Sequence, residues 1–142
     1  MLLSIEPDSP VPIYQQIRDR IVEAIAAGRL PAGSALPSTR QLAVDLGVNF
    51  HTVNKGYDLL RQEGLLRLGR KSGAVVRRDA SSGPPDPGWV QDWTGRLRTL
   101  LAEAAAQGMP AAEIVRGCQA AIADFAFPAA VAEAGNGSES PS

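Results

Sequence analysis

The sequence predicts a mainly α-helical fold with a small β-hairpin, arranged as an N-terminal domain and a short C-terminal pair of helices. Three observations predict this class. Apolar residues recur with helical spacing in five stretches of the chain, glycine or proline flanks most of these stretches, and two short runs that can form strands surround a polar turn containing glycine. The chain has 142 residues, 44% of them hydrophobic, which is enough for one domain with an appendage.

The first helix is predicted from Pro12 to Ala27. Its apolar residues recur every four positions, at Ile13, Ile17, Ile21 and Ile25. This spacing is typical of a helix that buries one face. Gly28 can end the helix in the left-handed conformation, and the segment 29–37, which contains prolines and a glycine, is predicted to be a connector.

Two short helices with a tight turn between them come next. Ser38 opens the first of them, and Gln41 completes the sequence pattern of a capping box. Gly47 ends this helix, and Asn49 caps the following one, which is predicted to continue to about Glu63. A short turn with glycine in it gives this pair the spacing of a helix-turn-helix.

A β-hairpin is predicted after the third helix. Residues 65–68 and 74–77 can form two short strands around a polar, glycine-bearing turn, in which Arg70 and Lys71 stand next to each other. A hairpin with a cationic tip that follows three helices is a wing. We therefore predict a winged helix-turn-helix domain over residues 1–78.

The C-terminal part is predicted to be a linker, two helices and a tail. Residues 79–88 are rich in serine, proline and glycine, as linkers are. Residues 89–128 carry two amphipathic helices, and small and polar residues over 129–142 predict disorder. Two helices are too few to bury their apolar faces within one copy, so we expect them to pair two copies. The predicted dimer interface consists of Trp89, Trp93, Leu97, Leu100, Leu101, Ile114, Val115, Ile122 and Phe125.

Charge is divided along the chain. The net charge is −1, but residues 1–78 hold eleven Lys and Arg against seven Asp and Glu, whereas residues 79–142 hold three against eight. Phosphate binding needs a local positive surface rather than a basic chain, so the N-terminal domain can bind nucleic acid. An ordinary solvated charge cluster explains the same counts equally well.

Several classes of protein are not expected. A single cysteine and a single histidine exclude a disulfide framework and a cysteine-rich zinc site, and they leave no catalytic constellation, so we predict neither a metal, nor a cofactor, nor an enzyme. Cys118 lies on an apolar helical stripe and is expected to pack rather than to sense redox state. The first residues lack the pattern of a secretory signal and no apolar run approaches the ~20 residues of a membrane span, so a cytoplasmic location is expected.

The polar start of the third helix carries the side chains expected to read DNA. Asparagine can pair with adenine, threonine and histidine can contact bases or phosphates, and a helix N-terminus favours phosphate. Ser38 is expected to act primarily as a helix cap, Asn49 is explained equally well as a cap, and Tyr57 is expected in the core. The residues predicted to contact DNA are Ser38, Thr39, Arg40, Asn49, His51, Thr52, Asn54 and Lys55, and in the wing Arg70, Lys71 and Gly73.

A series of short motifs occurs in order over residues 9–77. They are Ile13-Tyr-Gln-Gln-Ile, Gly28-Arg-Leu-Pro-Ala-Gly-Ser-Ala-Leu-Pro, Leu36-Pro-Ser-Thr-Arg-Gln-Leu-Ala, Leu46-Gly-Val-Asn, Thr52-Val and Leu60-Arg-Gln-Glu-Gly-Leu-Leu. The series resembles the GntR family of bacterial regulators, and the short helical extension resembles its YtrA-type subgroup, in which two helices mediate dimerisation. The chain departs from the pattern at Phe50, where proline or arginine is frequent, and at Ala74-Val75 in the wing.

The resemblance implies a sequence-specific transcriptional regulator, expected to be a repressor that binds a palindromic operator on double-stranded DNA as a homodimer. It also implies that the large effector domains of other subgroups are absent. A fused aminotransferase domain is not expected either, because the chain is too short to include one. A winged-helix module that binds protein instead of DNA is the alternative. An unidentified small-molecule effector stays open, because two helices offer little room for a pocket of ~300 Å³.

Overall fold

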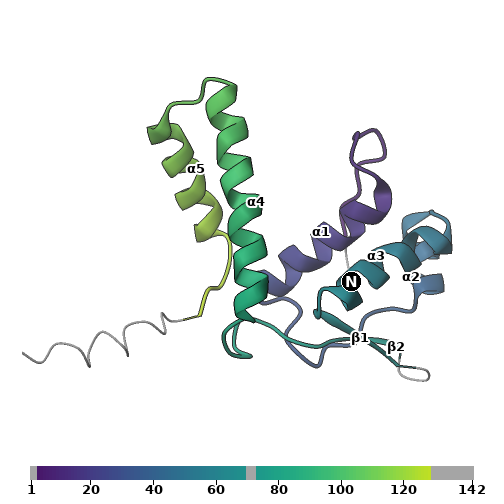
Figure 1. Cartoon of the computed structure of the whole chain (residues 1–142). Coiled ribbons are helices and arrows are strands. Elements are labelled where there is room, and N and C mark those ends of the chain that lie inside the picture. The colour runs from purple at the N-terminus through teal and green to yellow at the C-terminus, as the bar shows by residue number, and fades with distance from the viewer. Residues whose placement is uncertain (1–2, 70–72, 129–142) are drawn as a thin grey trace, which may run out of the picture.

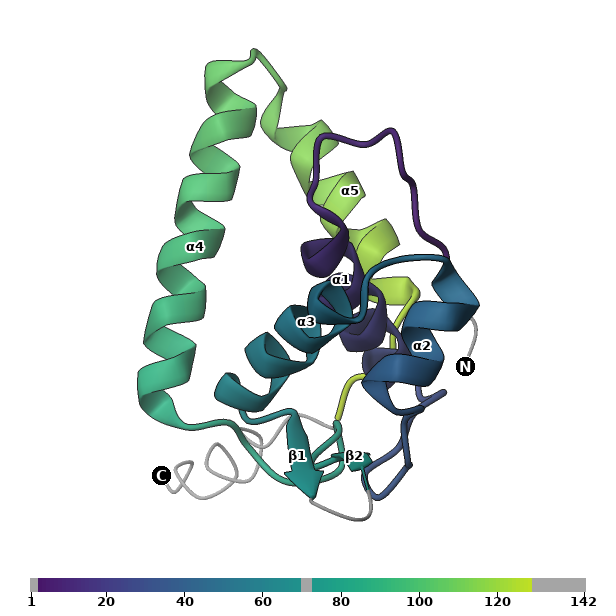
Figure 2. The same cartoon turned by 90° about the vertical axis from the view of Figure 1, so that its right-hand side faces the viewer.

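The computed structural model describes residues 3–69 and 73–128, and these residues form five helices and a two-stranded antiparallel sheet. The elements in chain order are α1 (Ile13–Ala26), α2 (Thr39–Leu46), α3 (Phe50–Gln62), β1 (Leu66–Gly69), β2 (Gly73–Val76), α4 (Pro87–Ala106) and α5 (Ala111–Ala123). The first three helices and the hairpin form one body, and α4 with α5 stands beside it (Figures 1 and 2). The predicted helical class with a small hairpin, in winged-helix order, is confirmed.

The predicted caps set the ends of the helix-turn-helix. The Ser38 hydroxyl accepts a hydrogen bond from the Gln41 N–H at 3.1 Å, and the Asn49 side chain accepts one from the His51 N–H at 2.8 Å. The capping box at the start of α2 is only half formed, because the Gln41 side chain donates to Asp45 at 2.8 Å instead of returning to Ser38. Gly47 ends α2 with a φ of +69°, which a left-handed turn requires.

The hairpin is shifted by one residue from the prediction. β1 begins at Leu66 rather than Leu65, because the Leu65 N–H is still bonded to the Leu60 carbonyl at the end of α3. In the ladder Leu66 faces Val76, and the sheet ends where Gly69 faces Gly73. Residues 70–72, which include the predicted wing-tip cations, lie outside the described residues.

A third extended segment runs beside β2, although the sequence predicted only a connector there. The Gly33 N–H donates to the Val76 carbonyl at 2.8 Å, the Val76 N–H to Ser34 at 2.9 Å, and the Leu36 N–H to Ala74 at 2.9 Å. The sequence did not predict this extended segment, because the glycine and prolines around it are typical of a connector. It joins the hairpin to the segment that leads into α2, so the wing and the helix-turn-helix are one unit.

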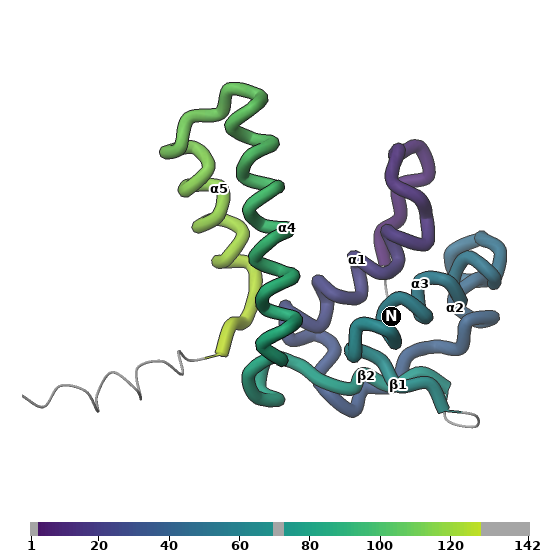
Figure 3. The backbone as a smooth tube through the Cα atoms, in the orientation of Figure 1, coloured from purple at the N-terminus to yellow at the C-terminus, as the bar shows by residue number. Residues whose placement is uncertain are grey.

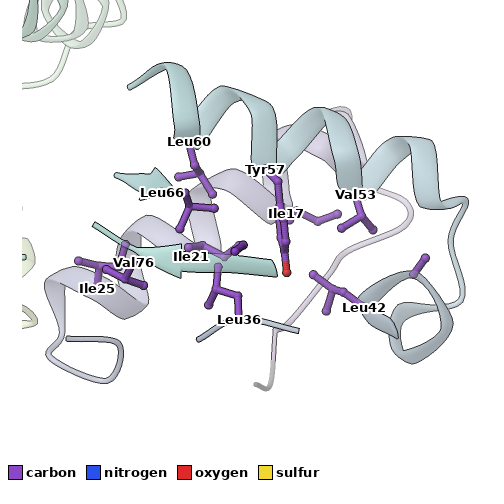
Figure 4. Packing of buried hydrophobic residues seen from close by; sticks show 12 residues of the cluster. Ile17, Ile21, Ile25, Leu36, Leu42, Val53, Tyr57, Leu60, Leu66 and Val76 are labelled. Atoms are coloured by element: carbon purple, nitrogen blue, oxygen red, sulfur yellow. The ribbon is translucent and has the colours of Figure 1, made fainter. Parts of the chain in front are cut away.

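The core lies between α1, α2, α3 and the sheet (Figure 4). Its fully buried side chains come from every one of these elements: Ile17, Ile21, Leu42, Val53, Tyr57, Leu60, Leu66 and Val76. α1 and α3 approach closely at Gly56, where a Cβ atom would lie 3.0 Å from the Tyr14 carbonyl oxygen. The core therefore fixes α3 by its inner face and leaves its outer face free.

A buried glutamine that the sequence reading did not single out fixes the segment before α1. The Gln16 side chain is 4% exposed. It accepts a hydrogen bond from the Glu6 N–H at 2.7 Å and donates to the carbonyls of Glu6 and Val11 at 3.0 and 2.8 Å. A single amide thus satisfies three backbone groups, which explains why a polar side chain is buried here.

The Tyr57 hydroxyl ties α3 to the loop before α2, as it donates to the Pro37 carbonyl at 2.8 Å. Burial raises the pKa of this phenol, so it is a neutral donor. We expect Tyr57→Phe to lower the free energy of unfolding by about 1–2 kcal/mol, because it leaves a carbonyl without its partner. Urea denaturation measures this loss. Tyr14→Phe, which keeps a half-buried ring on α1, is the control, and an equal loss in both variants would contradict the assignment.

The α4–α5 pair is attached to the body at both of its ends. Before α4, the Asp79 carboxylate accepts the Ala32 N–H at 2.8 Å, and this bond, with those from Ser81, lowers the pKa of Asp79 to about 2. After α5, the Ala126 N–H donates to the Ala26 carbonyl at the end of α1, at 2.8 Å. Figure 3 follows the chain from β2 up through α4 and back down along α5.

α4 begins two residues before the predicted helix. Asp86 is its N-cap and accepts from the Gly88 and Trp89 N–H groups at 3.0 and 3.3 Å, with Pro87 in the first turn. A proline costs nothing at that position, which explains why a stretch with the composition of a linker starts a helix. No helix among the described residues is long and apolar enough to cross a membrane.

Candidate DNA interface

The outer face of α3 carries most of the predicted reading residues. Asn49, His51, Asn54 and Lys55 are exposed and Thr52 is half-buried. The opposite face holds Val53, Gly56, Tyr57 and Leu60, all buried against α1, α2 and the sheet. Since the buried face cannot turn without breaking the core, the polar face is presented to solvent in a fixed orientation.

The start of α2 lies next to the start of α3. Ser38 and Arg40 are exposed and Thr39 is half-buried. The Arg40 guanidinium carbon lies 4.5 Å from the centroid of the Phe50 ring, and the Phe50 and His51 ring centroids are 4.1 Å apart. The structure thus brings Arg40 and the first turn of α3 together through an aromatic ring that was not among the predicted contacts.

Lys55 is held by a partner on α1. Its ammonium nitrogen lies 4.1 Å from the centroid of the Tyr14 ring. A cation–π contact at an exposed site is worth about 0.5–1 kcal/mol, which a phosphate contact can replace. Tyr14 was missed in the sequence because a contact between two helices leaves no local signal.

Some basic side chains around the wing are exposed to solvent, and others are hydrogen-bonded to the protein backbone. Arg67 on β1 is exposed. Arg77 donates to the Gly64 carbonyl at 3.4 Å, and Arg78 donates to the Gly83 carbonyl at 2.6 Å, so these two cations are turned toward the protein's own backbone. Gly73, at the start of β2, has a φ of +71°. Arg70 and Lys71 lie outside the described residues, and their predicted contacts stay predictions.

Two carboxylates close to this face are occupied by their own neighbours. Asp45 accepts the Gln41 side chain at 2.8 Å. Asp58 accepts Arg61 at 2.7 Å and Gln62 at 2.7 Å, and the Arg61 hydrogen bond contributes most to lowering the pKa of Asp58. The Arg61 cation offsets the charge of Asp58, whereas the Gln41 amide is neutral and leaves Asp45 negatively charged.

An apolar hollow adjoins Arg40. It has a volume of about 400 Å³, is open to solvent, and is lined by Arg40, Ala43, Val44, Gly47, Val48 and Phe50. Val44 is 75% exposed within it. The sequence reading had singled out neither Val44 nor Phe50 as part of the interface, since apolar residues at helical spacing are usually core.

The residues predicted for the dimer interface fall into two groups. Most are exposed: Trp89, Trp93, Leu100, Leu101, Val115 and Ile122, with exposures from 37% to 61%. Leu97, Ile114 and Phe125 are half-buried within the single chain. The Trp89 and Trp93 rings stack with centroids 6.5 Å apart. Cys118 is exposed in the single chain, because no described element covers that side of α5, and its expected packing stays a prediction.

A helix-turn-helix with an exposed polar second helix, followed by a β-hairpin, defines the class of winged DNA-binding proteins. Comparison with known proteins then defines the family. The model for bacterial regulatory proteins of the gntR family matches residues 13–76. YtrA from Sulfolobus acidocaldarius, a GntR-family transcription factor of known structure, is 39% identical with a TM-score of 0.59, and the match covers 75% of this chain and 99% of that chain.

Two further proteins support the comparison. The HTH-type transcriptional repressor YtrA of Bacillus subtilis (strain 168) is 35% identical over 81 residues, which are 57% of this chain and 62% of that protein. A transcriptional antiterminator from Listeria monocytogenes EGD-e has the same fold over 92% of this chain and 97% of that chain, with a TM-score of 0.79 and 22% identity. The chain spans between 17% and 62% of the length of three curated relatives.

The chain belongs to the GntR family and is of the YtrA type, as the sequence motifs indicated. It is a transcriptional regulator with a DNA-binding domain, and its relatives are named as regulators rather than enzymes.

Proposed function

We propose that the chain is a repressor that binds a palindromic operator as a homodimer. Arg40 and the first two turns of α3 read bases in the major groove, and the wing residues Arg70, Lys71 and Gly73 contact the neighbouring backbone or minor groove. The observation that carries the proposal is the exposed polar face of α3, held from behind by the core and adjoining Arg40. The B. subtilis relative is itself named a repressor.

The division of labour follows from burial. Residues up to 78 form the reading domain with its own core, and α4 and α5, whose apolar side chains stay exposed in the single chain, join two copies. Two reading helices related by two-fold symmetry would then meet successive major grooves about 34–36 Å apart. As a regulator of transcription the protein would act in the cytoplasm, with or without a small-molecule effector.

Selection from a pool of random DNA duplexes tests this function. We expect the full chain to enrich a palindromic site. On that site His51→Ala or Asn54→Ala should lower the discrimination against a scrambled duplex by about 1–3 kcal/mol for each lost base contact, whereas Lys71→Ala should weaken both duplexes alike. Titration by fluorescence anisotropy at fixed salt measures both effects, because phosphate contacts make the affinity strongly dependent on salt.

The controls separate the proposal from its alternative. Gln91→Ala changes an exposed residue on α4 and should leave both affinities unchanged. Equal weakening of both duplexes by His51→Ala and Asn54→Ala would show that the reading face is wrongly assigned. Failure of the full chain to enrich any duplex would favour a winged-helix module that binds protein.

A further inference from the structure

Three side chains from two helices form one stack at the junction of α2 and α3. Arg40 comes from α2, and its guanidinium carbon lies 4.5 Å from the centroid of the Phe50 ring. His51 follows Phe50 on α3, with ring centroids 4.1 Å apart and ring planes at 32°. Phe50 is half-buried and packs against the core, while Arg40 and His51 are exposed. An anchored aromatic ring therefore lies under two exposed polar groups.

The stack restricts Arg40 without using its hydrogen-bond donors. A guanidinium that lies over an aromatic ring contacts it by its face, and its five N–H donors point outward in the plane. No carboxylate among the described residues forms an ion pair with Arg40. Its fork of donors is thus free to bind a base edge or a phosphate.

This restriction has a consequence for recognition. A free arginine side chain loses rotamer freedom when it binds, and this loss weakens binding. A guanidinium already held on a ring loses less, and its donors start in a defined orientation, which a bidentate contact with guanine requires. The His51 ring is held by the same phenylalanine, and the Asn49 cap fixes its backbone N–H at 2.8 Å.

We infer that Phe50 is a positioning residue of the DNA site, which holds Arg40 and His51 in one orientation and so determines sequence discrimination without reading a base itself. The inference rests on the proposed function of α2 and α3. It assigns a role to a side chain that was not among the predicted contacts.

The test compares Phe50→Leu with Phe50→Tyr. Leucine keeps an apolar group against the core but removes the ring, whereas tyrosine keeps the ring. On the duplex selected by the full chain, we expect Phe50→Leu to lower discrimination against a scrambled duplex roughly three- to tenfold. Phe50→Tyr should stay within about twofold of the parent, since its ring offers the same face. Thermal unfolding of both variants shows whether either change acts through stability instead.

Two further measurements isolate the positioning role. In an Arg40→Ala, His51→Ala background, Phe50→Leu should cause no additional loss of discrimination, because nothing is left to position. In the DNA-free protein, the NMR order parameter of the Arg40 Nε–H should fall in Phe50→Leu and be preserved in Phe50→Tyr. This second measurement does not depend on DNA binding, so it tests the stack even if no duplex is selected.

The possible outcomes distinguish failure of this inference from failure of the proposed function. An undiminished loss from Phe50→Leu in the Arg40→Ala, His51→Ala background, or an Arg40 guanidinium as mobile in the parent as in Phe50→Leu, would overturn the inference. An ordered Arg40 in a protein that selects no duplex would instead overturn the proposed DNA-reading function and leave the stack without that role.

Discussion

Gly56→Val should destabilise the DNA-binding domain by about 3 kcal/mol, a large share of the stability of a small domain. Gly56 is in the middle of α3 on the face that packs against α1. A Cβ atom there would lie 3.0 Å from the Tyr14 carbonyl oxygen and 3.2 Å from a methyl carbon of Ile17. The carbonyl is part of the α1 backbone and cannot rotate away, so the two methyl groups of valine would force the helices apart.

The alanine variant tests the same close approach with a smaller side chain. Alanine favours the helix over glycine by about 1 kcal/mol, so Gly56→Ala sets that gain against the tight contacts of a single Cβ atom with Tyr14 and Ile17, and its stability should fall between those of the parent and the valine variant. Gly95→Val on α4 is the control, because a Cβ atom there meets nothing within 4 Å. Urea denaturation followed by circular dichroism measures all three. A cost for Gly56→Val no larger than that for Gly95→Val would refute the close packing of α1 on α3.

The features that the sequence predicted well are local ones. The isoleucine spacing gives the buried face of α1, and the caps at Ser38 and Asn49 act within three residues of themselves, so the chain itself carries their signal. Gly47 marks the end of α2 for the same reason. Helix order, the hairpin and the family resemblance all follow from such short-range patterns.

The features that the sequence did not predict depend on partners far along the chain. The strand-like segment before α2 is defined only by bonds to β2, some forty residues later. Gln16 looks like any polar helical residue until its backbone partners at Glu6 and Val11 are in place. Phe50 has an apolar side chain, which predicts a place in the core. Its position in the interface is visible only in the folded structure, where Arg40 of α2 lies against its ring.

The apolar face of α4, which we propose joins two copies, gives the second large effect. Trp93 and Leu100 lie seven residues apart, about two helical turns, on one face of α4, and they are 43% and 61% exposed in the single chain. Contiguous apolar side chains of this size are unfavourable in water and mark an interaction surface. If two copies bury this face, two reading domains bind one operator together.

We expect the double substitution Trp93→Glu, Leu100→Glu to make the chain monomeric and to weaken binding to the selected palindrome by about a hundredfold or more, because the second reading domain no longer binds at a raised effective concentration. Binding to a duplex with one half-site should change little. Light scattering gives the oligomeric state and anisotropy gives the affinity. Val11→Glu, which also charges an exposed apolar residue but in the loop before α1, should change neither. A double variant that stays dimeric would show that another face joins the copies, and a monomer that binds the palindrome undiminished would show that one reading domain suffices.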